Sequence, residues 1–148
     1  MNQDTIKATG RVRYELRNEH GEIKDTREYD NLVVTVGKTY LAAWLAAASQ
    51  AGEFMSYVGL GTNNSGPTTG DTGLGSPLAT YVVGTLTSSS NIWQNVASFG
   101  PGVDTGSITE AGLFSTGAPG TMFARQTFAV INKAAGDTLQ VTWQVTFS

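Results

Sequence analysis

Few residues in this chain could carry chemistry, and their spacing does not assemble a reactive site locally. The single histidine, His20, falls in a predicted, exposed turn, Asn18-Glu19-His20-Gly21, with no obvious partner to orient it, which argues against a Ser-His-Asp relay. The sequence has no cysteine, which excludes thiolate nucleophiles, disulfides and cysteine-based zinc sites. Beyond position 30 the carboxylates are isolated from one another: Glu53, Asp71, Asp104, Glu110 and Asp137. We therefore predict no enzyme activity, no metal site and no cofactor, although pairing of these acids in the fold stays open.

Two further patterns resemble binding motifs without completing them. Gly37-Lys38-Thr39 is like the end of a phosphate-binding loop, but that motif needs a glycine five residues before Gly37, where Leu32 stands. Three tryptophans, Trp44, Trp93 and Trp143, could stack on sugar rings. Trp143 shares the apolar face of its strand, however, so we predict that it belongs to the core.

The N-terminal segment 1–30 is predicted to form a charged hairpin or arm, distinct from a β-sandwich domain over residues 31–148. Arg11 to Arg17 alternates between an apolar side and a charged side, which is typical of a half-exposed strand. A turn at 18–21 follows, and residues 23–29 can return antiparallel. We predict that this hairpin contacts a partner protein through Arg11, Arg13, Arg17 and Tyr14.

The rest of the chain predicts a mainly β fold, an antiparallel sandwich or barrel-like domain, with one helix at about residues 36–49. Thr35 is a plausible N-cap, and Trp44 lies on the face expected to enter the core. Predicted strands follow at 55–60, 79–87, 91–99, 108–115, 121–131 and 138–147. The last has the clearest apolar face, assigned to the core: Leu139, Val141, Trp143, Val145 and Phe147. The Gly-rich segment 61–76 is too long for a simple turn, so it is either a contact loop or a flexible one.

Charge is concentrated in the N-terminal segment 1–30. The chain has 9 basic and 12 acidic residues, a net charge of -3, which is the wrong sign for a general nucleic-acid binder. Beyond position 30 only Lys38, Arg125 and Lys133 are basic. Such a charge-poor surface indicates either that much of it faces other subunits or that the protein is a neutral, well-hydrated β domain. The polar start and the short apolar run at 41–48 predict a soluble protein, made in the cytoplasm, with no membrane partner.

Several segments, taken in order, resemble small virion proteins of tailed bacteriophages, described as capsid decoration, tail or fibre-associated proteins. They are Asn31-Leu32-Val33 with Gly37-Lys38, Tyr57-Val58-Gly59-Leu60-Gly61-Thr62, Ile108-Thr109-Glu110-Ala111-Gly112-Leu113-Phe114, Met122-Phe123-Ala124-Arg125, and Asp137-Thr138-Leu139-Gln140-Val141-Thr142-Trp143. The resemblance implies a β-sandwich subunit that oligomerises, often as a trimer, on a symmetric particle. It places Glu110 and Gly112 at a structural turn, with the Glu110 carboxylate accepting hydrogen bonds that lock the turn.

The resulting expectation is a cement protein on the capsid surface of a virion, with the major capsid protein as its partner. Residues 1–17 are expected to add a strand to a capsid edge, and deletion of them is expected to leave a folded oligomer that no longer binds capsids. The alternative is a tail-tip, baseplate or fibre-associated module whose loops at 61–76 and 100–107 touch a host receptor or glycan. A free carbohydrate-binding domain or small hydrolase is a third possibility.

Overall fold

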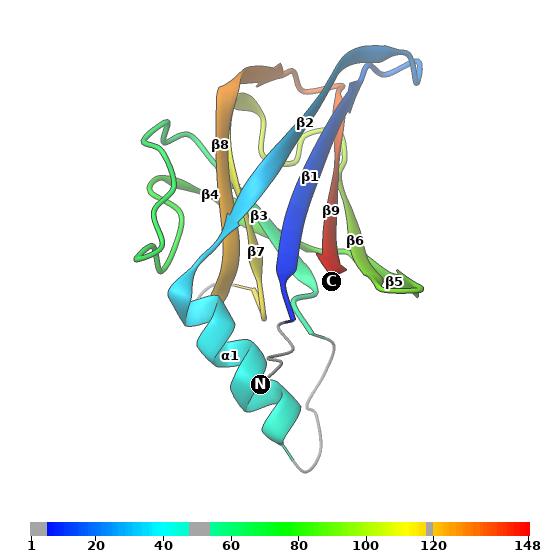
Figure 1. Ribbon diagram of the computed structural model, residues 1–148. Helices are drawn as coiled ribbons and strands as arrows, with labels where there is room; N and C mark the ends of the chain where they lie inside the picture. The colour runs from blue at the N-terminus through cyan, green and yellow to red at the C-terminus, as the bar shows by residue number, and fades with distance from the viewer. Residues whose placement is uncertain (1–5, 48–53, 118–119) are drawn as a thin grey trace.

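The computed structural model describes residues 6–47, 54–117 and 120–148, which form an antiparallel, nearly closed barrel of nine strands with a single helix (Figure 1). The mainly β, barrel-like fold predicted from the sequence is confirmed. The elements, in chain order, are β1 (Ala8–Arg17), β2 (Ile23–Val33), α1 (Thr35–Ala46), β3 (Tyr57–Gly61), β4 (Pro77–Val83), β5 (Thr85–Ser89), β6 (Ile92–Phe99), β7 (Gly106–Phe114), β8 (Met122–Lys133) and β9 (Thr138–Phe147).

A bent strand closes the barrel. The strand order is β4-β3-β7-β8-β2-β1-β9-β6-β5, so the first and last strands of the sheet are neighbours in the chain, joined by Gly84 alone. The sequence predicts a single strand at 79–87, which the structure divides into β4 and β5. The strand is interrupted at Gly84, where only glycine fits, because any side chain would overlap the buried amide of Asn95. That amide donates to Met55 O at 3.0 Å. The first half of the bent strand bonds β3, and the second half bonds β6.

A seam runs between β2 and β8. These strands pair only at Leu32 with Arg125 and at Val33 with Ala124, and then separate. Arg27 bridges the gap, because its guanidinium donates to the carbonyls of Ala129 and Val130 on β8. The Arg27 guanidinium thus provides these two β8 carbonyls with the hydrogen-bond donors that the backbone N–H groups of a fully paired strand would provide.

The described part of the N-terminal segment 1–30 belongs to the barrel, in contrast to the separate hairpin or arm that we expected. β1 pairs with β2 on one side and along its whole length with β9 on the other. Its apolar side chains Val12, Tyr14 and Leu16 are in the core. Deleting residues 1–17 would remove this central strand, so the folded deletion product that we anticipated is incompatible with the structure.

Alternation along the strands builds the core. In β9, Leu139, Val141, Trp143 and Val145 are buried, while the residues between them are only partly so. Phe147, which we had also assigned to the core, is half-buried and packs against it. Because strands show successive side chains to opposite faces, this pattern leaves the other face of β9 outside the barrel.

Helix α1 begins at Thr35 and projects from one end of the barrel (Figure 1). Val34 occupies the N-cap position, and no side chain caps the helix, so the predicted capping role of Thr35 is wrong. The helix ends at Ala46, and the predicted end at 48–49 falls outside the described residues. Gly37 is buried against β8, and an added Cβ would lie 2.5 Å from Phe123 Cα. Glycine therefore lets the first turn of α1 pack directly on β8.

Candidate interaction surface

An apolar groove lies between α1 and the neighbouring ends of the strands, and we call it the α1 groove. Its volume is about 440 Å³, and its lining is entirely apolar or aromatic: Leu41, Trp44, Leu45, Phe54, Leu86, Trp93, Val145 and Phe147. Leu45 is 66% exposed, and the only charged residue of α1 is Lys38. An apolar surface of this kind on one end of a molecule is typical of a protein interaction site.

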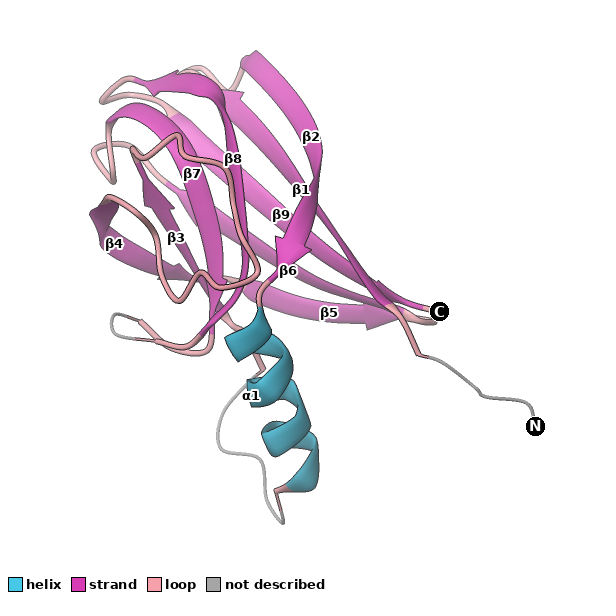
Figure 2. Ribbon diagram, turned by 60° about the vertical axis from the view of Figure 1, so that its left-hand side comes forward, coloured by secondary structure: helices cyan, strands magenta, loops and turns pink. Residues whose placement is uncertain are grey.

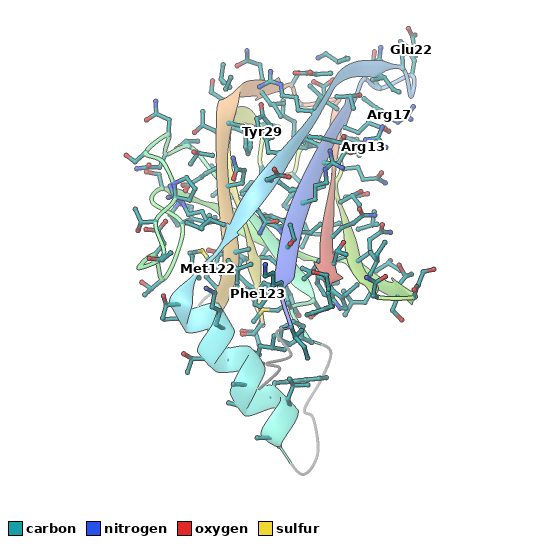
Figure 3. All side chains as sticks on the ribbon, in the orientation of Figure 1. Arg13, Arg17, Glu22, Tyr29, Met122 and Phe123 are labelled. Carbon is teal, nitrogen blue, oxygen red and sulfur yellow. The ribbon has the colours of Figure 1, made fainter. Side chains whose placement is uncertain are left out.

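The helix is attached at its first turn and by one aromatic cluster. Val34 N–H donates to Phe123 O at 3.0 Å, and Figure 3 shows Phe123, at the start of β8, beside the start of the helix. Phe54 joins the helix to the barrel, since its ring lies 5.4 Å from that of Trp44 and 5.5 Å from that of Phe123. Trp44 is half-buried in this cluster, not in the core as predicted, because α1 lies outside the barrel. The exposed residues in the second half of α1 are all apolar: Ala42, Ala43, Leu45 and Ala46.

A buried ion network holds the long 62–76 loop. The Glu110 carboxylate, fully buried, accepts hydrogen bonds from the backbone N–H groups of Ser76 at 2.8 Å, Gly75 at 3.0 Å and Asn63 at 3.3 Å. Arg125, from β8, contacts the same carboxylate at 2.9 Å. The resemblance implied that the Glu110 carboxylate accepts hydrogen bonds and locks a turn, and it does accept backbone hydrogen bonds. Glu110 lies instead inside β7, and it fixes a loop that is distant in sequence.

Arg125 completes the network on the loop side. Its guanidinium donates to Asp71 Oδ2 at 2.9 Å and to Ser65 O at 3.1 Å. Burial favours a raised pKa for Asp71, but hydrogen bonds from the Thr68 backbone and hydroxyl, together with Arg125, outweigh it and lower the pKa. Charge-assisted bonds from Glu110 and Arg125 to five residues of one loop give that loop a defined shape. The segment is therefore tied to the barrel, and its middle contacts α1, since Thr35 N–H donates to Thr69 O at 2.8 Å.

Gly112 is the other residue that we assigned to a structural turn, and that assignment is wrong. It lies inside β7, opposite Gly59 on β3 and Arg125 on β8. An added Cβ would lie 2.7 Å from the ring of Phe114. The glycine therefore provides room for an aromatic side chain on the face of the sheet.

The basic residues of β1 lie on the outer face of the barrel. Arg11 and Arg13 border a polar hollow of about 370 Å³ that is also lined by Glu28, Gln94, Val96, Gln140, Thr142 and Gln144. Figure 3 shows Arg13 and Arg17 on β1 toward the hairpin end. Arg17 bonds Glu15 at 2.6 Å and Gly21 O at 2.7 Å. A surface of this kind, with each arginine close to a carboxylate, offers polar contacts but little net charge.

Tyr14 cannot contact a partner as predicted, because it is 1% exposed and sits in the core. Its ring lies 4.2 Å from that of Phe128. Burial raises the pKa of Tyr14 well above its ordinary value, and Tyr29 adds to the effect. Strand addition by β1 is also excluded, since both of its edges are paired within the barrel.

A second group of charges lies where the β8–β9 turn meets the hairpin. Lys24 donates to Asp137 at 2.7 Å, and this bond is the main cause of the lowered pKa of Asp137. Lys133 is 2% exposed and donates to Gly100 O at 2.8 Å, while burial lowers its pKa. Burial also raises the pKa of Asp104, against hydrogen bonds from Thr80. These contacts pin the turns at this end of the barrel together.

The structure also shows the surroundings of His20 and of the side chains that could bind a metal. His20 is exposed and lies 3.4 Å from Glu19. Within residues 6–47, 54–117 and 120–148, no three histidine, cysteine or carboxylate side chains gather as a metal site would require. In the same part of the chain, no helix has the length and hydropathy needed to cross a bilayer.

Sequence reasoning missed two residues that shape this surface. Arg125 is the only charge in the run Met122-Phe123-Ala124-Arg125-Gln126-Thr127-Phe128, a pattern that indicates a buried partner. Leu45 belongs to the apolar run 41–48, and only the placement of α1 beyond the barrel end shows that its side chain is exposed. Comparison with known proteins adds no relative, since no protein-family model, no curated protein and no solved structure matches the chain.

Proposed function

We propose that this protein is a non-enzymatic structural component of a bacteriophage particle, acting as a capsid decoration protein that binds the outer shell. The observation that carries the proposal is the α1 groove, an uncharged apolar surface on a helix that projects from the barrel. The choice of a phage particle rests on the resemblance to phage virion proteins of the segments at 31–38, 57–62, 108–114, 122–125 and 137–143. The major capsid protein is the proposed partner, and attachment as a homotrimer would multiply weak contacts.

The physical basis of binding is burial of the groove and of Leu45. Aromatic side chains such as Trp44 and Trp93 in a concave apolar site are typical of the residues that dominate binding energy. A subunit that binds only the assembled shell stabilises it by its binding free energy. Polar contacts from Arg11 and Arg13 would orient the subunit while adding little affinity, because exposed ion pairs contribute about 0–1 kcal/mol.

The proposal is tested by co-sedimentation of purified protein with particles stripped of it. Leu45→Glu places a charge in the interface and should weaken binding at least about tenfold, a loss of about 1.4 kcal/mol. Ile23→Glu is the matched control, because Ile23 is also an exposed apolar residue, 55% accessible, but starts β2 at the other end of the barrel (Figure 1). Equal binding by both variants, or equal loss by both, would contradict the proposed role of the groove.

A tail-tip, baseplate or fibre-associated module is the second candidate. It is favoured by the 62–76 loop, since the bonds from Glu110 and Arg125 hold a long surface loop in one shape suited to a receptor. Gel densitometry of whole particles separates the two candidates. A decoration protein should approach the copy number of the shell protein, whereas a tail component should be present in a few copies.

A further inference from the structure

Strand β5 has an open edge beside the α1 groove. It pairs with β6 on one side only and is an end strand of the sheet. Figure 2 shows it as the outermost strand on the side from which α1 projects. The strand, Thr85-Leu86-Thr87-Ser88-Ser89, contains no charge and no proline. Natural proteins usually protect exposed edges by charge, proline, a cover or a very short strand, and β5 has only its five-residue length, so its edge is available for pairing.

The backbone geometry defines which groups face this edge. Gly84 N–H bonds Ser56 O at 2.8 Å and so continues the pairing of β4 with β3. The backbone N–H and C=O groups of successive residues in a strand point to alternate sides. Those of Leu86 and Ser88 therefore point to the same side of the strand as Gly84 N–H, which is the unpaired edge of β5 beyond the end of β3. Within the described residues, neither has a backbone partner on that side.

We propose that β5 pairs antiparallel with β5 of a second copy of this chain, around a two-fold axis at Thr87. In this register Leu86 faces Ser88 of the second copy, which allows four backbone hydrogen bonds. The remaining side chains oppose hydroxyl with hydroxyl: Thr87 with its own counterpart and Thr85 with Ser89. No charge meets a like charge, and Thr–Thr and Thr–Ser pairs across strands are favourable. The strand is therefore complementary to itself, as a two-fold interface requires.

Pairing across this axis would place both α1 grooves on the same face of the joined sheet. Leu86 lines the groove from the side of β5, so the apolar surface would continue from one copy toward the next. The inference goes beyond the proposed function, because it concerns self-association and needs no phage particle. A two-fold contact is also compatible with a trimer, which would use a different interface.

Single cysteine variants test the register, because the chain contains no other cysteine. Thr87→Cys should form a disulfide-linked dimer on mild oxidation, since the two thiols face each other across the axis. Thr85→Cys is the matched control: it is on the same strand face, but its counterpart would lie roughly 14 Å away along the strands, beyond disulfide reach. We expect dimer formation at least tenfold faster for Thr87→Cys, and cross-linking between Thr85→Cys and Ser89→Cys when the two are mixed.

Sedimentation equilibrium of the protein without cysteine variants is the second measurement. The unmodified chain should associate to dimers or to larger assemblies containing them, and Ser88→Pro should weaken this association because it removes an edge N–H. The circular dichroism of Ser88→Pro should remain that of the folded barrel. The inference is overturned if the unmodified chain stays monomeric, or if Thr85→Cys cross-links as fast as Thr87→Cys. Either result leaves binding to particles to be decided separately.

Discussion

The 62–76 loop and helix α1 both extend from the barrel, but different interactions hold them. The loop is bound from within by Glu110 and Arg125, whose charges are buried and bonded to its backbone. The helix is held by a glycine contact and an aromatic cluster, and Leu45 remains exposed. Polar bonds are directional and satisfied inside one chain, whereas apolar surface is satisfied by any complementary apolar partner. The loop region is thus internally complete, while the helix region is suited to binding.

Of the changes that test this comparison, breaking the ion network of Glu110 and Arg125 should lower the free energy of unfolding most. Arg125→Met leaves the Glu110 carboxylate buried without its cation, which should lower the free energy of unfolding by about 3–5 kcal/mol. Urea denaturation measures the change. Adding Glu110→Gln to Arg125→Met should recover part of the loss, and Arg11→Met, at an exposed pair, should change stability by no more than about 0.5 kcal/mol. A small effect of Arg125→Met would show that the loop needs no such network.

Disturbing the helix attachment should have an intermediate effect. Gly37→Ala improves helix propensity by about 1 kcal/mol, but its methyl group would lie 2.5 Å from Phe123 Cα. The overpacking should dominate, with a net loss of about 1–3 kcal/mol and faster hydrogen exchange in α1. Ala43→Gly is the control, since it lowers propensity on an exposed position without touching β8. A stabilised Gly37→Ala variant would mean that α1 does not depend on close contact with β8.

Protonation of Asp71 in acid should weaken the attachment of the 62–76 loop, with the smallest expected change in the free energy of unfolding. The pKa of Asp71 is lower in the folded protein than its ordinary value, so its ionised form stabilises the fold above about pH 3.9. That contribution is lost as the pH falls through the lowered pKa. The difference in unfolding free energy between the wild type and Asp71→Asn should therefore be largest near neutral pH and vanish in acid. Asp104 and Asp137 titrate in both proteins and cancel from the difference. A pH-independent difference would contradict the ionic role of Asp71.

The local patterns of the chain determined much of the fold. Alternation in residues 138–147 predicted β9 with its inner face, and the alanine-rich run after Thr35 predicted a helix, because periodicity reports which side of an element avoids water. The ionic character of residues 11–17 likewise predicted an outer face for Arg11 and Arg13. The same alternation placed Tyr14 on the apolar side of its strand, so its assignment as a contact residue neglected a signal that was present.

Tertiary structure alone decided where these elements meet. The bend at Gly84, the insertion of β1 between β2 and β9, and the meeting of Glu110 with Arg125 and the 62–76 loop all join residues that are separated in the chain or have no local pattern. Periodicity reports the face of a strand but not its neighbour, because strand pairing depends on long-range contacts. For the same reason the exposure of α1 and the open edge of β5, on which the proposed interactions depend, became visible only in the folded barrel.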